Sequence, residues 1–238
     1  MPPLVTLTSD FGTGSPYVAA MKAAVLAACP DALPVDISHA VDPFDVRAGA
    51  FVLWVGSSRF PAGCVHLAVV DPGVGSDRHA LAIEAGASFY VGPDNGLFDY
   101  VLAGAPSWRA VALARPQGAS RTFEGRDVFA PAAGALANGV PLATLGLPVR
   151  ELAKLPASGP AVVWVDGFGN LVTDLEPPVR PLRINARLVS AAAATYAEAP
   201  EGEPFVYVGS MGRLEVGVKR ARADALLGAG VGSAIELA

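Results

Sequence analysis

The sequence Val69-Val70-Asp71-Pro72-Gly73-Val74-Gly75-Ser76-Asp77-Arg78 predicts the end of a buried strand in a central sheet. The apolar run 67–70 fits a strand covered on both faces, and Pro72-Gly73 then turns the chain. Ligands bind at the carboxyl ends of strands in open α/β sheets, so Asp71 and Arg78 are candidates for a charged pair in a site. The alternative is an aspartate that caps its own loop and an arginine in solvent. This segment alone leaves both interpretations open.

A second aspartate repeats this arrangement near the start of the chain. Residues 4–8 predict the first strand, and Asp10 follows it just before a glycine turn. Ser15 suits the N-cap and Pro16 the first position of the next helix. The glycines of this turn match neither a dinucleotide-binding fingerprint nor a P-loop. Two strand-end carboxylates before glycine turns indicate a functional role for Asp10 and Asp71.

Strands alternate with helices over the first 150 residues. We therefore predict an α/β N-terminal domain with a mostly parallel, helix-covered central sheet. Its last helix is expected over residues 127–138, with Asp127 as the N-cap and Glu124 just before it.

The composition changes after this domain. Prolines, Ser158 and Gly159 predict a linker at 151–160, between domains at 1–150 and 161–238. The second domain reads as small and all-β. The alternation from Leu182 to Leu188 predicts one half-buried strand within it.

Composition narrows the class of protein. Hydrophobic residues make up 52% of the 238 residues, yet no apolar run reaches the ~20 residues that span a bilayer. The net charge is -5 and the arginines are scattered, which argues against a nucleic-acid partner. The first residues lack the features of a signal peptide, which predicts a cytoplasmic protein. Cys29 and Cys64 form no disulfide framework or metal motif.

Five segments, in this order along nearly the whole chain, resemble one family, the S-adenosyl-L-methionine hydroxide adenosyltransferases. These are hydrolytic relatives of the fluorinating and chlorinating enzymes. The segments are Thr8-Ser9-Asp10-Phe11-Gly12, Val70-Asp71-Pro72-Gly73-Val74-Gly75 with Arg78, Pro93-Asp94-Asn95-Gly96-Leu97, Phe123-Glu124-Gly125-Arg126-Asp127-Val128-Phe129-Ala130-Pro131 and Asp166-Gly167-Phe168-Gly169-Asn170.

The resemblance implies a reaction and an assembly. Water and S-adenosylmethionine would give adenosine and L-methionine, with no metal and no cofactor. The C-terminal domain would be a β-barrel. The family forms trimers, in which each site lies between the N-terminal domain of one subunit and the C-terminal domain of its neighbour.

The resemblance also implies residue roles. Asp10 would hold the ribose hydroxyls, because a carboxylate accepts two hydrogen bonds. Asp71 and Arg78 match two members of the family's Asp-Arg-His set, which prepares the water. The other matching substrate contacts are Phe44, Asn170, Ser210, Glu215 and Val218.

This chain departs from the family at the third member of that set, where Glu124 stands in place of histidine. An ionised Glu124 would leave two carboxylates with one guanidinium, whereas a protonated Glu124 would donate a hydrogen bond as the histidine does. We expect a hydrolase in which Glu124 orients the water. Gly125 stands where fluorinating enzymes have a halide-contacting serine, which argues against halide chemistry. The segment 219–223 also departs from the family's Asn/Gly-rich loop.

Two other functions remain as alternatives. One is a protein that binds S-adenosylmethionine or adenosine with little or no turnover, because Glu124 and the loop at 219–223 differ from the family. The other is a metal-dependent phosphohydrolase that uses Asp10, Asp36, His39 and Asp71. We rank it last, because no pair among these residues has a recognisable ligand spacing.

Overall fold

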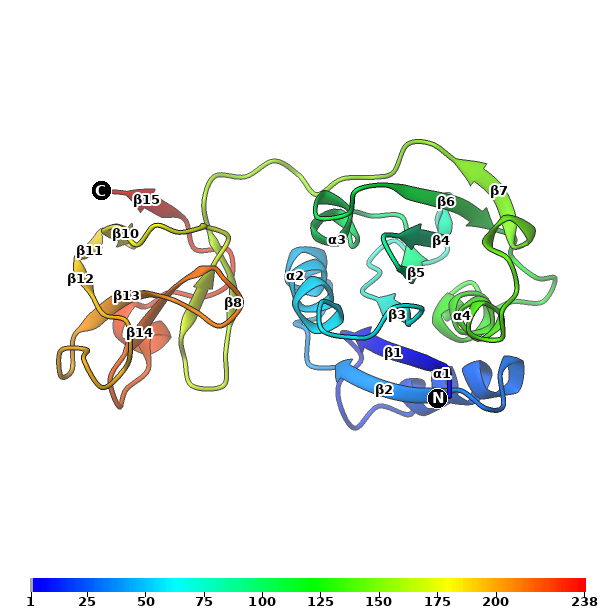
Figure 1. Cartoon of the computed structure of the whole chain (residues 1–238), viewed down its shortest axis with the longest axis horizontal. Coiled ribbons are helices and arrows are strands. Elements are labelled where there is room, and N and C mark those ends of the chain that lie inside the picture. Colours follow the sequence, from blue (N-terminus) through cyan, green and yellow to red (C-terminus); the bar gives the residue numbers. More distant parts are fainter. Residues whose placement is uncertain (1) are drawn as a thin grey trace. The chain divides into compact units, whose positions relative to one another are not determined.

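The computed structural model describes residues 2–238, which divide into two compact units between Leu155 and Pro156 (Figure 1). Each unit has its own core of buried apolar side chains. Within the described residues, no helix combines the length and the apolar composition that crossing a bilayer requires.

The first unit is built on a seven-stranded sheet, in the order β2-β1-β3-β5-β4-β6-β7. Its strands are β1 (Leu4–Ser9), β2 (Leu33–Ser38), β3 (Val65–Val69), β4 (Ala80–Ala85), β5 (Ser88–Pro93), β6 (Trp108–Leu113) and β7 (Gly146–Val149). The strands β2, β1, β3 and β5 are parallel neighbours, whereas β5-β4, β4-β6 and β6-β7 are antiparallel.

The sheet is therefore mixed, and the sequence-based expectation of a mostly parallel sheet is wrong. The cause is the short connection between β4 and β5, where Gly86 adopts a φ of 59°. A tight hairpin can join only antiparallel strands, and the two strands after it, β6 and β7, continue that pattern. The strands β6 and β7 were not predicted from the sequence.

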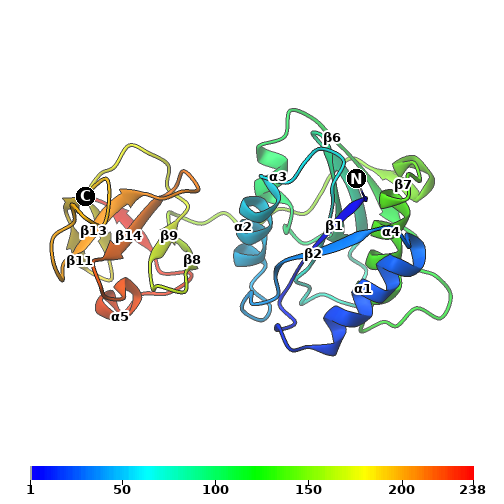
Figure 2. The same cartoon turned by 60° about the horizontal axis from the view of Figure 1, so that its bottom comes forward.

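Helices cover both faces of this sheet (Figures 1 and 2). On one face lie α1 (Pro16–Ala28) and α4 (Ala130–Ala137), which pack against each other. On the other face lie α2 (Val46–Ser57) and α3 (Asp99–Ala103). Every residue of β3 is buried, as expected of a strand covered on both sides.

The local signals at the helix starts were confirmed only in part. Ser15 is the N-cap of α1, where its hydroxyl accepts a hydrogen bond from the main chain of Tyr17, and Pro16 follows as predicted. The helix expected from Asp127 instead begins earlier, as a π-helical turn over Gly125–Phe129 that leads into α4. Asp127 is thus inside the helical segment, where it pairs with Arg126 and accepts a hydrogen bond from the N–H of Ser120.

The second unit contains strands and one short helix, α5 (Ala223–Leu227). One sheet has the order β12-β13-β14-β9-β8, and the other has the order β11-β10-β15. The strands are β8 (Val162–Val165), β9 (Leu171–Thr173), β10 (Leu182–Ile184), β11 (Arg187–Val189), β12 (Ala191–Ala192), β13 (Pro204–Val208), β14 (Leu214–Val218) and β15 (Ile235–Leu237).

The single strand predicted from Leu182 to Leu188 is instead the hairpin of β10 and β11. Asn185 and Ala186 form its two-residue turn, with φ values of 48° and 63°. Positive φ at both central positions is the geometry of the favoured two-residue hairpin turn. The sequence keeps alternating through the turn, so the periodicity did not reveal it, although the turn pairs Leu188 with Arg183 on the exposed face and Val189 with Leu182 on the buried face.

Candidate functional site

The carboxylates of Asp10, Asp71 and Glu124 line one cavity of about 260 Å³ in the first unit. Asp10 follows β1 and Asp71 follows β3, and these two strands are parallel neighbours with Ser9 opposite Val69. Adjacent parallel strands end at the same edge of a sheet, which brings the two carboxylates to one place. Glu124 immediately precedes the π-helical turn. Phe44 lines the same cavity.

Asp10 is connected to Phe44 through the main chain. The N–H of Phe44 donates a 2.9 Å hydrogen bond to Oδ2 of Asp10. Phe44 has a φ of 69° and is 70% exposed, so its ring is not part of the core. Positive φ at a bulky residue costs about 1–3 kcal/mol and occurs preferentially at ligand sites.

Asp71 and Arg78 form a buried bidentate pair. Nε of Arg78 donates a 2.8 Å hydrogen bond to Oδ1 of Asp71, and its Nη2 bonds Oδ2. Both side chains are less than a tenth exposed. Burial raises the pKa of the Asp71 carboxyl, and the neighbouring Arg78 opposes that shift. Of the two interpretations of this segment, the one with an arginine in solvent is wrong.

Glu124 extends this pair into a four-residue charge cluster, formed by Asp71, Arg78, Glu124 and Arg115. Nη2 of Arg78 donates to Oε2 of Glu124 at 2.6 Å, and Nε of Arg115 donates to Oε1. The sequence-based charge count of two carboxylates against one guanidinium omitted Arg115. The cluster holds two of each and is balanced.

The neighbours of Glu124 are hydrogen-bond donors. Guanidinium groups can donate hydrogen bonds but cannot accept them. Each carboxylate oxygen of Glu124 accepts a hydrogen bond from a guanidinium group. This environment suits an ionised carboxylate. A protonated carboxyl would find no acceptor for its proton on either guanidinium. In this arrangement Glu124 is a hydrogen-bond acceptor from Arg78 and Arg115.

The sheet topology places Arg115 in the charge cluster. β6 points the same way as β5, because both are antiparallel to β4, and β5 is parallel to β3. Arg115 lies two residues beyond β6 and so comes to the edge where Asp71 follows β3. Arg115 was not predicted from the sequence, because β6 was not predicted and no motif marks this residue.

In the second unit, Asn170 and Val218 line a cavity of about 500 Å³. Phe168, Tyr196, Arg220, Ala221 and Arg222 complete its lining. The hydroxyl of Tyr196 donates a 2.6 Å hydrogen bond to Oδ1 of Asn170.

A chain of hydroxyl groups joins Asn170 to Glu215. The hydroxyls of Tyr196 and Tyr207 are 3.1 Å apart, and that of Tyr207 donates to Oε2 of Glu215. Burial raises the pKa of Glu215. The two tyrosines were not predicted, and only the fold brings them together. Ser210 is exposed in the turn between β13 and β14. Within residues 2–238 its side chain makes no hydrogen bond to Asn170, Glu215 or the two tyrosines.

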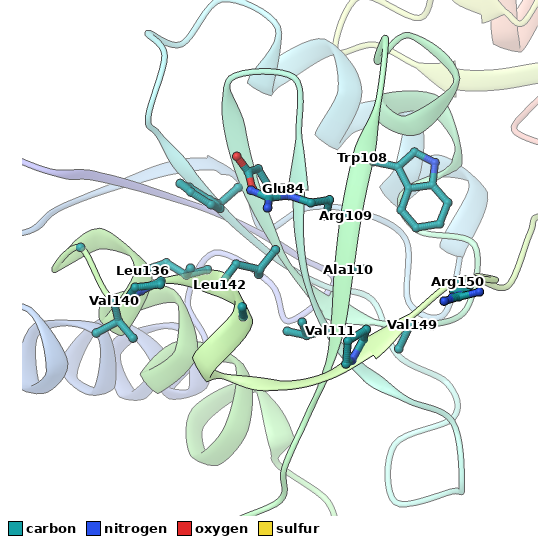
Figure 3. A pocket seen from close by; sticks show the side chains of 15 residues that line it. Glu84, Trp108, Arg109, Ala110, Val111, Leu136, Val140, Leu142, Val149 and Arg150 are labelled. Carbon is teal, nitrogen blue, oxygen red and sulfur yellow. The ribbon is translucent and has the colours of Figure 1, made fainter.

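A larger cavity of the first unit lacks this combination of groups. One of about 700 Å³ is lined by Trp108, Leu142 and Arg150 among others, and its Glu84 and Arg109 pair with each other (Figure 3). None of the predicted site residues lines it.

The residues of the phosphohydrolase alternative do not come together. Asp36 and His39 line a different cavity from the one that holds Asp10 and Asp71. Asp36 pairs there with Lys22 and His39. Over residues 2–238, no three His, Cys, Asp or Glu side chains are grouped so that they could hold a metal ion.

Comparison with known proteins assigns the chain to a family. The family model described as SAM hydroxide adenosyltransferase N-terminal domain matches residues 5–146, and the corresponding C-terminal domain model matches residues 160–236. The chain therefore belongs to the S-adenosylmethionine hydroxide adenosyltransferase family, as the sequence motifs predicted.

Individual relatives agree with this assignment. The chain is 43% identical to the (R)-S-adenosyl-L-methionine hydrolase of Thermus thermophilus, over 98% of each chain. The crystal structure of an uncharacterized conserved protein from Thermotoga maritima matches with a TM-score of 0.91 and 31% identity, covering 99% of this chain and all of the other. A fluorinase of Actinoplanes sp. is more distant, at 25% identity over 89% of each chain.

Proposed function

We propose that this protein hydrolyses S-adenosyl-L-methionine to adenosine and L-methionine. The observation that carries the proposal is the buried Asp71–Arg78 pair, which lies with Glu124 at the cavity that Asp10 also lines. The family and the names of the relatives supply the substrate.

The proposed reaction is an in-line displacement at C5′ of the adenosyl group. The water oxygen bonds to C5′ while the C5′–S bond breaks, and the bonding electron pair stays on sulfur. The sulfonium becomes the neutral thioether of methionine, so the leaving group needs no proton. Asp71 accepts the proton that the water loses and later returns it to solvent. A general base of this kind contributes about 10²–10⁴-fold.

Arg78 and Glu124 act on that base and on the water. Arg78 keeps Asp71 ionised and in place through two hydrogen bonds. Glu124 lines the cavity and has carboxylate lone pairs beyond those that meet the two arginines, so it can accept a hydrogen bond from the water and orient it. The water is thereby aimed at carbon before the reaction begins.

The substrate contacts would come from both units. Asp10 would accept hydrogen bonds from the ribose hydroxyls, with Phe44 packed nearby. Asn170, Ser210, Glu215 and Val218 would contact the adenosine and methionine ends.

We propose a two-domain subunit with boundaries at 1–150, 151–160 and 161–238, and with a barrel-like second domain. We also propose a cytoplasmic homotrimer that needs no metal or cofactor and has its sites at subunit interfaces, as the family resemblance implies.

Incubation with S-adenosylmethionine in ¹⁸O-water tests the reaction. We expect label in the 5′-hydroxyl of adenosine above the enzyme-free background, and loss of that label with Asp71→Asn. Calorimetric binding without labelled product would support the binding-protein alternative and refute hydrolysis.

A further inference from the structure

Arg115 lies where three parts of the first unit meet. Its Nε donates to Glu124, and its Nη2 donates to the main-chain oxygens of Arg78 at 2.8 Å and of Ser76 at 3.4 Å. One guanidinium thus connects the end of β6, the loop after β3 and the segment before the π-helical turn. Arginine suits this place because its planar group offers five donors in a fixed geometry.

These contacts form a closed ring of hydrogen bonds that joins Arg115, Glu124 and Arg78. Arg115 holds the main-chain oxygen of Arg78 and one oxygen of Glu124, and the other oxygen of Glu124 holds Nη2 of Arg78. The guanidinium of Arg78 also lies over the ring of Phe129, with 5.4 Å from Cζ to the ring centroid. Arg78 is therefore held at its main chain and at its guanidinium, whose Nε and Nη2 donate to Asp71 while Nη1 donates to the main-chain oxygen of His79 at 3.2 Å.

Arg115 also balances the charge of the site. Glu124 is 2% exposed, and a buried carboxylate without enough positive charge nearby is costly. Arg78 alone would have to neutralise both Asp71 and Glu124. The side chain of Arg115 is 40% exposed, so solvent reaches part of it while its Nε stays in contact with Glu124.

We propose that Arg115 is a positioning residue for the hydrolysis. It keeps Glu124 ionised and immobile, and through Glu124 and the main chain of Arg78 it keeps Arg78 aimed at Asp71. The inference rests on the proposed function. It assigns to this chain an Arg–Glu unit at the place where the family's set has a histidine.

A double-mutant cycle with Arg115→Met and Glu124→Gln tests the inference. We expect Arg115→Met to lower kcat about 10- to 100-fold, the size of effect that a displaced catalytic group produces, with KM changed less than about threefold. The acid limb of kcat should move to higher pH, because a cation that favours the ionised carboxylates is gone. In the Glu124→Gln background, Arg115→Met should cost much less, because the charged partner is already absent.

Two further measurements separate positioning from folding. Millimolar guanidinium chloride should restore part of the kcat of Arg115→Ala, because the free cation can occupy the vacated place. If Arg115→Met and Arg115→Ala fold poorly, Arg115→Lys takes their place in the comparison of kcat with the wild type. The matched control is Arg109→Met, which removes an exposed arginine paired with Glu84 between β6 and β4 and should leave kcat unchanged.

The outcomes are distinguishable. A wild-type protein that forms no adenosine overturns the proposed function itself. An active wild type whose kcat survives Arg115→Met within twofold overturns the role of Arg115. An equal loss of kcat on Arg115→Met with and without the Glu124→Gln substitution also overturns that role. A change confined to KM, or a failure of guanidinium to restore any kcat of Arg115→Ala, overturns it as well.

Discussion

The main-chain N–H of Phe44 donates to the carboxylate of Asp10, and Phe44 has a positive φ of 69°. Glycine adopts this conformation without strain, whereas alanine does not. The same segment presents the Phe44 ring at the cavity. The contribution of the Phe44 ring to substrate binding and the effect of its positive φ on stability can therefore be measured separately.

Phe44→Gly should be more stable to unfolding than Phe44→Ala by about 1 kcal/mol, because only glycine relieves the strain. Both variants should raise KM for S-adenosylmethionine about fivefold, from the loss of about 1 kcal/mol of apolar contact. Urea denaturation and steady-state kinetics measure the two effects. Leu147→Ala, which truncates an exposed side chain on β7, is the control. Equal stability of the two Phe44 variants would contradict the strain argument.

Asp71 should set the acid limb of the pH–rate profile. Its carboxyl must be ionised to accept a proton, and burial raises its pKa above the ordinary value of 3.8. Activity should therefore be full at neutral pH and fall as the pH drops, with the midpoint above 3.8. Asp71→Asn should lower kcat about 10²–10⁴-fold and abolish this limb. A midpoint at or below the ordinary value would contradict the assignment.

Tyr196 should support substrate binding through Asn170. Tyr196→Phe removes the donor to Oδ1 of Asn170, worth about 0.5–1.5 kcal/mol, and should raise KM about two- to tenfold with little change in kcat. Gly217→Ala should act similarly, because an added Cβ would lie 2.6 Å from the Tyr196 hydroxyl oxygen.

The control for Gly217→Ala is Gly230→Ala, where an added Cβ meets no atom within 4 Å. Its KM should match that of the wild type. An unchanged KM in both Tyr196→Phe and Gly217→Ala would show that Asn170 needs no such support.

His66 should make the protein sensitive to acid. Its ring is fully buried and bonds Thr6, and burial lowers its pKa from 6.5 to about 4. The unfolded chain therefore binds a proton at a pH where the folded chain does not, so stability falls as the pH drops from 6.5 to about 4. The loss amounts to about 3 kcal/mol at the lower end.

Denaturant unfolding of the wild type and of His66→Gln, at pH 7 and at pH 4, measures this contribution. We expect the variant to be less stable at pH 7 but to lose about 3 kcal/mol less across the interval. The difference between the two proteins isolates His66, because Asp71 and Glu215 titrate in both. Parallel pH dependences would contradict the prediction.

Local features of the fold were predictable from the sequence. Ser15 and Pro16 start α1 because capping depends on neighbours in the chain. Asp10 and Asp71 were recognisable because each ends an apolar strand before a turn. The mixed sheet and the hairpin of β10 and β11 were not, since a short turn such as Asn185-Ala186 does not disturb the alternation on either side.

The sequence by itself determined the family, the two strand-end carboxylates and the substitution of Glu124 for histidine. Only the tertiary structure decided how that substitution is accommodated. Arg115 stands nine residues before Glu124, yet reaches it because β6 runs parallel in direction to β3 and ends at the same edge. Charge balance in a buried site depends on distances in space. The charge balance around Asp71 and Arg78 therefore includes Arg115, which no local pattern of the sequence connects to them.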